Sequence, residues 1–127
     1  MKRFTIAALV VLMGLTTLSY AGSPQEEQQT PQQRAWRLID DGALLIDVRS
    51  RQEYESGHLD NSINIEHEEV EKMAETIGED KEREVVVYCR SGRRSGEAKK
   101  ALEEYGYKNI HNGIGYEGLK KARPKTS

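Results

Sequence analysis

The sequence predicts an α/β domain built on a parallel sheet of four to five strands, with helices on both faces. Two observations lead to this prediction. Short apolar runs of the kind found in buried strands alternate along the chain with segments whose apolar residues recur at helical spacing. Strands and helices that alternate in this way form parallel sheets with right-handed crossovers. The length of 127 residues allows one such domain.

The first expected helix is marked by a capping box. Thr30 precedes Pro31, which suits the first helical position, and Gln33 lies three residues after Thr30. The helix is expected to stop at 41–42, where the sequence reads Asp-Gly. Trp36 falls on its apolar side, so we expect this residue in the core rather than at a binding site.

The other expected elements follow from the same kinds of pattern. Ser50 and Glu53 predict a short capped helix through Ser56. The strongest strand signal is Val85-Val86-Val87-Tyr88, because β-branched residues favour strands. The remaining strands are expected at 44–46, 62–65 and 107–110, and the remaining helices at 67–77 and 95–105, with a turn at 113–118 that leads into a last helix ending near Lys121.

The N-terminus has the order of a secretory signal peptide. Lys2 and Arg3 precede an apolar run at 4–18, and small residues flank Tyr20 at 19–21. We expect cleavage after about Ala21 and export to the periplasm. A retained membrane anchor is the alternative, although a run of about 15 residues is short for a bilayer. Residues 22–29 are expected to form a flexible linker before a domain at 30–122 and a C-terminal tail at 123–127.

Composition narrows the function classes. The formal net charge of −2 gives no basic excess of the kind that binds nucleic acid, and we expect no membrane contact after signal cleavage. The histidines have no metal-ligand spacing, so no metal site is expected. Nothing in the sequence requires more than a monomer. The single cysteine, Cys89, cannot form an internal disulfide, so it is either buried and inert or reactive.

Cys89 comes directly after the strand at 85–88, and ligands of parallel sheets bind beyond the carboxyl ends of the strands. Backbone N–H groups of the loop that follows, and of the next helix start, can create a positive field. Arg90, Arg93 and Arg94 add three permanent cations. A thiol with an ordinary pKa near about 8.5 needs only about 2 kcal/mol to be half ionised at pH 7. We therefore expect Cys89 to be a nucleophile that needs no histidine base.

A set of short motifs runs through the chain: Leu45-Ile46-Asp47-Val48-Arg49, Glu53-Tyr54, Gly57-His58-Leu59, Ser62-Ile63-Asn64-Ile65 and Val87-Tyr88-Cys89-Arg90-Ser91-Gly92-Arg93-Arg94-Ser95. With these motifs, residues from about 30 to 120 resemble the single-domain rhodaneses, particularly the small periplasmic thiosulfate sulfurtransferases. The resemblance implies a rhodanese-like sheet. It also implies that the Cys89 thiolate attacks the outer sulfur of thiosulfate, releases sulfite, and passes the bound sulfur to cyanide or a thiol.

The resemblance also assigns residues around the cysteine. It makes Cys89 the nucleophile and implies that the residues after it hold the anionic donor and the persulfide: Arg90, Ser91, Gly92, Arg93, Arg94 and Ser95. No metal or organic cofactor is implied. Asp47 and Arg49, at a strand end on the same face, are expected to support the loops as an internal ion pair. The turn Asn112-Gly113-Ile114 departs from the Asn-Gly-Gly turn common in these relatives, so the shape of the pocket wall beside it is left open.

Two alternatives remain open. Cys-x5-Arg phosphatases, and arsenate reductases with similar chemistry, place an arginine six positions after the cysteine; here that position is Ser95, and Arg94 comes one position early. A shorter loop leaves less room for a phosphoryl group, while a single sulfur still fits. The other alternative is a persulfide carrier that hands its sulfur to a partner protein without turning over small molecules.

Overall fold

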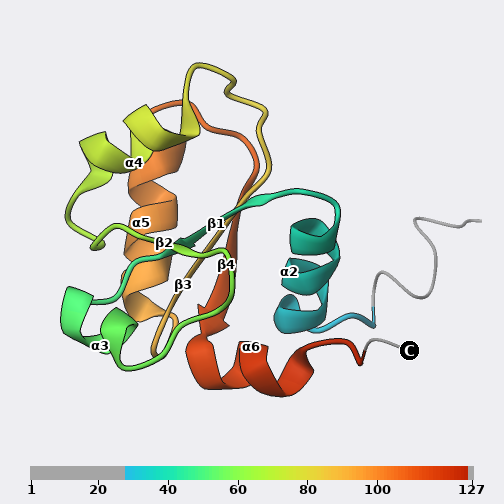
Figure 1. Ribbon diagram of the computed structural model, residues 1–127. Coiled ribbons are helices and arrows are strands. Elements are labelled where there is room, and N and C mark those ends of the chain that lie inside the picture. Colours follow the sequence, from blue (N-terminus) through green and yellow to red (C-terminus); the bar gives the residue numbers. More distant parts are fainter. Residues whose placement is uncertain (1–27, 126–127) are drawn as a thin grey trace, which may run out of the picture.

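Four parallel strands form one sheet in the computed structural model, which describes residues 28–125 (Figure 1). The first three strands lie close to where the sequence predicts them. The strands occur in the spatial order β2-β1-β3-β4, with bounds β1 (Leu44–Asp47), β2 (Ile63–Asn64), β3 (Val85–Cys89) and β4 (Ile110–Gly115).

Helices cover both faces of this sheet. On one face lie α4 (Val70–Ile77) and α5 (Arg93–Glu104), and on the other lie α2 (Pro31–Asp40) and α6 (Tyr116–Ala122) (Figure 1). The short α3 (Arg51–Glu55) follows β1. The α/β fold class and the helices on both faces, predicted from the sequence, are therefore confirmed.

The central strand β3 is buried on both sides, because its side chains alternate between two cores. Val85, Val87 and Cys89 face the core under α4 and α5, whereas Val86 and Tyr88 face the core under α2 and α6. All five residues have no exposed surface. Cys89 therefore ends a strand that both cores hold in place.

Both predicted capping boxes are present. The Thr30 Oγ1 accepts the Gln33 N–H at 3.1 Å, and the Ser50 Oγ accepts the Glu53 N–H at 3.2 Å. In each box the side chain of the third residue accepts in return from the N–H of the capping residue. The starts of α2 and α3 are thus determined by short-range hydrogen bonds that the sequence encodes directly.

Trp36 lies in the core, as predicted, with 5% of its surface exposed. Its Nε1–H donates to the carbonyl oxygen of Leu119 at 2.7 Å. This hydrogen bond joins α2 to α6 across the face of the sheet that the two helices cover.

The prediction of a last strand at 107–110 is wrong, because β4 lies at Ile110–Gly115. Tyr107 follows the end of α5 and is bonded to it: its N–H donates to the Leu102 carbonyl at 3.2 Å, and its hydroxyl donates to the Gly78 carbonyl at 2.7 Å. Residues 113–115, expected as a turn, instead belong to β4. Pairing with the buried β3 overrides their weak strand preference, with a bulge at Gly113.

Two helix starts also differ from the predictions. α4 begins at Val70 rather than at residue 67, because the Glu69 N–H donates to the Glu66 carbonyl and closes a turn before the helix. α5 begins at Arg93 rather than at residue 95. The loop between Cys89 and α5 is therefore only residues 90–92.

Among residues 28–125, no helix is long and apolar enough to cross a membrane. The signal peptide expected at 1–21 lies outside the described residues, as do residues 22–27 of the expected linker.

Candidate active site

The site lies at the carboxyl ends of the two central strands. Cys89 is the last residue of β3, and Asp47 is the last residue of β1. Residues 90–92 lead from Cys89 into α5, so the cysteine is close to the N-terminus of this helix. The first N–H groups of a helix have no partner within it and attract negative charge.

Hydrogen bonds from this loop and helix start hold the Cys89 sulfur. The Gly92 N–H donates to Sγ at 3.0 Å, and the Ser95 Oγ lies 3.3 Å from Sγ. Burial alone would raise the pKa of Cys89. The Ser95 hydroxyl and the backbone amides of Ser95, Gly92 and Ser91 outweigh the effect of burial, so the pKa of Cys89 is lowered. The surroundings of the thiol therefore favour a nucleophile.

Two glycines allow the loop to lie against the end of β4. Gly92 has a φ of +95°, which favours glycine, and a Cβ there would come within 2.9 Å of the Ile114 Cγ2. A Cβ at Gly115 would overlap the carbonyl oxygen of Arg90. The close fit of loop and strand thus requires both positions to lack a side chain.

The three arginines predicted around the sulfur have different surroundings. Arg90 is exposed. The Arg93 side chain is 72% exposed and pairs with Glu97 at 3.0 Å, one turn along α5. The Arg94 side chain is 20% exposed and pairs with Glu53. Within residues 28–125, the hydrogen-bond partners of the sulfur are backbone amides and the Ser95 hydroxyl, and no arginine is among them.

Glu53 links α3 to α5. Its carboxylate accepts hydrogen bonds from the Arg94 guanidinium at 2.7 and 3.0 Å and from the Ser50 N–H at 3.2 Å. Arg94 is the main cause that lowers the pKa of Glu53 to about 2, with burial opposing it and Ser50 adding to it. The pKa of Arg94 is raised, first by Glu53 and to a smaller extent by the charge of Cys89. Arg94 is therefore oriented by a carboxylate at the edge of the cysteine loop.

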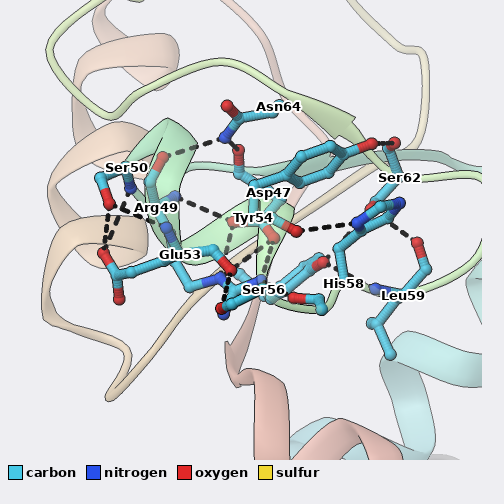
Figure 2. Close-up of polar contacts among 12 residues, drawn as sticks. Asp47, Arg49, Ser50, Glu53, Tyr54, Ser56, His58, Leu59, Ser62 and Asn64 are labelled. Carbon is cyan, nitrogen blue, oxygen red and sulfur yellow. Dashed lines mark hydrogen bonds and ion pairs between the residues drawn. The ribbon is translucent and has the colours of Figure 1, made fainter.

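The expected ion pair of Asp47 and Arg49 is present and buried. The Arg49 Nη2 lies 2.7 Å from the Asp47 Oδ2 and also donates to the Gly57 carbonyl at 2.7 Å. The guanidinium carbon lies 4.5 Å from the ring centroid of Tyr116. Figure 2 shows the polar contacts of this pair at the end of β1. The pair thus connects the segment after β1 to the start of α6.

A cleft of about 290 Å³ opens beside the loop. It is lined by Arg49, Glu53, Ser56, Arg90, Tyr116 and Glu117. The Arg49 guanidinium is held by Asp47 and the Gly57 carbonyl. The exposed guanidinium of Arg90 is therefore the better placed of the two to bind an oxyanion through paired hydrogen bonds. A larger cleft of about 700 Å³ along α4 contains none of these residues and is lined mainly by glutamates, which repel anions. The smaller cleft is therefore the candidate binding site for an anion.

Comparison with known families decides what kind of domain this is. The model of the rhodanese-like domain family matches residues 31–121. This chain belongs to the rhodanese-like domain family.

Relatives of this rhodanese-like domain differ in how much of their length it covers. The thiosulfate sulfurtransferase PspE of Escherichia coli (strain K12) is 41% identical over 81 residues, which are 64% of this chain and 76% of PspE. The tRNA uridine(34) hydroxylase of Hamiltonella defensa subsp. Acyrthosiphon pisum (strain 5AT) is 35% identical over 79 residues, which are 59% of this chain but 22% of that protein. A solved structure of a rhodanese with anions from E. coli has a TM-score of 0.56 at 39% identity, covering 60% of this chain and 89% of that one.

A second polar network in this rhodanese-like domain involves several motif residues quoted above (Figure 2). The Asn64 Nδ2 donates to the carbonyl oxygens of Asp47 and Arg49 at 3.0 and 2.9 Å. The Tyr54 hydroxyl donates to the Ser62 carbonyl at 2.7 Å, and the Ser62 Oγ donates to the Leu59 carbonyl at 2.6 Å. These side chains satisfy backbone groups of the segments after β1 and α3, and so keep the surroundings of the Asp47–Arg49 pair in place.

Sequence reasoning gave Asn112 no role in the rhodanese-like site, although it lies beside the cysteine loop. The Asn112 Nδ2 donates to the Gly92 carbonyl at 3.1 Å, and its Oδ1 accepts from the Ser95 Oγ at 2.7 Å. The same Oδ1 accepts the Ile114 N–H at 2.9 Å. The only sequence signal was the unusual turn at 112–114. It did not determine the shape of the pocket wall, and it gave no indication of a contact with Ser95.

Proposed function

We propose that this domain is a thiosulfate sulfurtransferase that moves the outer sulfur of thiosulfate to cyanide or a thiol through a persulfide on Cys89. One observation carries the proposal. The Cys89 sulfur lies at the end of the central strand and accepts hydrogen bonds from the loop and helix start, which lower the pKa of the thiol. Membership of the rhodanese-like family and the similarity to PspE support it.

The first half-reaction loads the cysteine. The Cys89 thiolate attacks the outer sulfur of thiosulfate, and a new sulfur–sulfur bond forms. The bond between the two sulfurs of thiosulfate breaks, and its electron pair leaves with sulfite. The products are a Cys89 persulfide anion and sulfite, and the backbone amides that hold the thiolate can hold the persulfide charge in the same way.

The second half-reaction unloads the sulfur. Cyanide or a thiolate attacks the outer sulfur of the persulfide, and the electron pair of the broken bond returns to Cys89 as thiolate. Cyanide leaves as thiocyanate, and a thiol leaves as its own persulfide. Each half-reaction moves one neutral sulfur atom and leaves the charge on Cys89 at −1, so the two half-reactions need no external oxidant or reductant.

Arg90 and Arg49 are proposed to hold the donor in the 290 Å³ cleft. Arg94, oriented by Glu53, is proposed to stabilise the negative charge on the sulfur from α5. Because Cys89 has no exposed surface, a donor in the cleft meets the sulfur only after residues 90–92 or the side chains above them move. Return to the closed arrangement shields the persulfide from other thiols between the two half-reactions.

The proposal includes export to the periplasm with cleavage after about Ala21, and a monomeric domain that acts on small sulfur compounds. The mass of the chain recovered from the periplasmic fraction tests the cleavage site. A mass that retains residues 1–21 would contradict this part of the proposal.

The decisive experiment compares the native chain with Cys89→Ser in steady-state assays with thiosulfate and cyanide. We expect the variant to lose turnover completely, since the chain contains no other thiol. Circular dichroism is the control for folding, because the serine oxygen keeps nearly the shape of the buried sulfur. Thiocyanate formation by a folded Cys89→Ser variant would overturn the proposal.

Two further measurements separate the alternative functions. Mass spectrometry after incubation with thiosulfate alone is expected to show the native chain heavier by one sulfur atom. A loaded chain that does not turn over with cyanide or small thiols would indicate a carrier instead of an enzyme. Hydrolysis of a phenyl phosphate ester by the native chain, lost in Cys89→Ser, would indicate a phosphatase, and we expect none.

A further inference from the structure

The side-chain amide of Asn112 has one possible orientation. One end meets the Gly92 carbonyl oxygen at 3.1 Å, which requires the NH₂ group there. The other end meets the Ile114 N–H at 2.9 Å, which requires the oxygen there. Turning the amide over would set two donors against each other at one end and two acceptors at the other. The Asn112 Oδ1 is therefore fixed as an acceptor.

This fixed acceptor decides where the Ser95 proton points. The Ser95 Oγ lies 2.7 Å from the Asn112 Oδ1 and 3.3 Å from the Cys89 Sγ. A hydroxyl has one proton, and Oδ1 has none to give. When the cysteine is a neutral thiol, its S–H donates to the Ser95 Oγ, and the Ser95 hydroxyl donates to Asn112. All three groups are then satisfied in one chain of hydrogen bonds.

Ionisation of the thiol disrupts this chain. A thiolate needs donors, but the Ser95 proton is directed at Asn112, and a lone pair of the Ser95 oxygen faces the sulfur. To donate to the thiolate, the Ser95 hydroxyl has to rotate and give up its 2.7 Å hydrogen bond to Asn112. The Asn112 Oδ1 remains satisfied by the Ile114 N–H after that rotation.

We propose that Asn112 is a positioning residue that governs the ionisation of Cys89 by competing with the sulfur for the hydroxyl proton of Ser95. In the resting state this competition offsets part of the stabilisation that the loop amides give to the thiolate. A negative charge that develops on the sulfur draws the Ser95 proton away from Asn112. The inference rests on the proposed function only in taking Cys89 as the reactive thiol.

Other charged groups surround this relay and stay constant in the variants below. They are Arg90, Arg93 and Arg94 in the loop and α5, Glu53 from α3, Asp47 and Arg49 from the end of β1, His67 and Glu97 at the edge of α5, and Arg34, Lys99 and His111 around Asn112. Their fields act on the Cys89 thiol in the native chain and in its variants alike. Differences in the alkylation midpoint between variants therefore reflect the hydrogen bonds among Cys89, Ser95 and Asn112.

The test is the pH dependence of alkylation of Cys89 by iodoacetamide in the full chain, which needs no sulfur transfer. For Asn112→Ala we expect the midpoint to move to lower pH and the rate below the midpoint to rise about 2- to 10-fold, because the Ser95 proton becomes free for the thiolate. For Asn112→Asp we expect the midpoint to move to higher pH, since a carboxylate holds that proton more strongly and adds negative charge.

A merely structural role for Asn112 predicts a different result. Loss of the bond to the Gly92 carbonyl would loosen the loop in both variants and move both midpoints upward. Midpoints that move in the same direction therefore overturn the proposal. If Asn112→Ala does not fold, Asn112→Asp is compared in the native and Ser95→Ala backgrounds, because it keeps the size and the acceptor of the native side chain. We expect a smaller upward shift of the midpoint in the Ser95→Ala background, and equal shifts in the two backgrounds overturn the proposal.

Ser95→Ala provides the matched background. If Asn112 acts through the Ser95 hydroxyl, adding Asn112→Ala to Ser95→Ala is expected to leave the alkylation midpoint unchanged. The same shift in both backgrounds would overturn the proposal. Normal alkylation behaviour together with absent thiosulfate turnover would instead contradict the proposed function and leave the relay intact.

Discussion

Ile114 has a φ of +76°, a conformation that β-branched residues rarely adopt. The left-handed region costs an L-residue about 1–2 kcal/mol, because Cβ approaches a carbonyl oxygen. Two contacts hold the residue there: its N–H donates to the Asn112 Oδ1, and its side chain packs on Gly92. Strain of this kind persists where the surroundings over-determine it, and it is concentrated at functional sites. Here it places an isoleucine against the residue that donates to the cysteine sulfur.

The strain leads to a prediction about stability. Ile114→Gly is expected to be more stable than Ile114→Ala by about 1 kcal/mol, because glycine adopts a positive φ without a steric penalty. This order is the reverse of the usual one in a strand, where glycine is less favourable than alanine. Urea unfolding of both variants at neutral pH measures the difference.

His111 gives the matched control within the same strand. It is half-buried like Ile114, but its φ is not positive. For His111→Gly and His111→Ala we expect the ordinary order, with alanine the more stable. If alanine were the more stable residue at both positions, Ile114 would not be strained as described.

Arg90 and Arg93 both lie close to Cys89 in the sequence, but their side chains have different surroundings. Arg90 lines the 290 Å³ cleft, whereas Arg93 faces Glu97 on the outside of α5. A charge-assisted hydrogen bond is worth about 1.5–3 kcal/mol. Arg90→Ala is therefore expected to raise the KM for thiosulfate about tenfold or more, with a smaller change in kcat. Arg93→Ala is the control, and steady-state kinetics with thiosulfate and cyanide measure both. Similar KM values for the two variants would exclude the cleft as the donor site.

At the scale of secondary-structure elements, those with strong local signals could be predicted from the sequence. The capping boxes at Thr30 and Ser50 locate α2 and α3, and the β-branched run before Cys89 locates β3. β4 could not be located, because its residues 111–113 are His-Asn-Gly, which favour turns over strands. β4 forms because it pairs with the buried strand β3. Pairing between distant segments cannot be detected in the pattern of residue types along a short stretch of sequence.

The same limit applies to the candidate site. The loop after Cys89 and its helix are contiguous in the chain, so their convergence on the sulfur could be predicted. Arg94 pairs with Glu53, which lies 41 residues away in the sequence, and Ser95 bonds to Asn112, which lies 17 residues away. Glu53 already had a local interpretation as a helix cap and Asn112 as part of a turn. A single sequence contains nothing that links such distant partners.

The Glu53–Arg94 pair between α3 and α5 predicts a pH dependence of stability. The folded state lowers the pKa of Glu53 to about 2, from an ordinary value near 4.5. The pair therefore stabilises the fold fully above pH 4.5, and this contribution is lost as the pH falls from about 4.5 to about 2. Glu53→Gln is expected to cost about 1–2 kcal/mol near neutral pH, after allowance for partial exposure, and progressively less across that window. Urea unfolding over a series of pH values measures both.

Glu55→Gln on the same helix is the control. Glu55 pairs with Arg51, but both side chains are more than 60% exposed. Exposed pairs of this kind contribute about 0.5 kcal/mol or less, so the control is expected to be nearly neutral at every pH. A cost for Glu53→Gln that stays constant down to pH 2 would contradict the assigned pKa.

At the scale of the whole molecule, the two cores share one strand. The core under α4 and α5 contains Met73 and Cys89, and the core under α2 and α6 contains Trp36 and Leu119. Every residue of β3 lies fully buried between them. Loss of packing on one face would expose this strand to water, so neither core can unfold while the other stays intact. The position of Cys89 at the end of β3 is then as stable as the whole domain.

This coupling can be measured because Trp36 is the only tryptophan and reports the core under α2 and α6. Met73→Ala removes a fully buried side chain from the opposite core and is expected to cost about 2–5 kcal/mol. Since the domain unfolds as one unit, the urea midpoint seen by Trp36 fluorescence should fall as much as the midpoint seen by circular dichroism, with the slope unchanged. Leu119→Ala is the matched change on the Trp36 side. If Met73→Ala lowered the circular dichroism midpoint and left the fluorescence midpoint in place, the two cores would be independent, and β3 would not couple them.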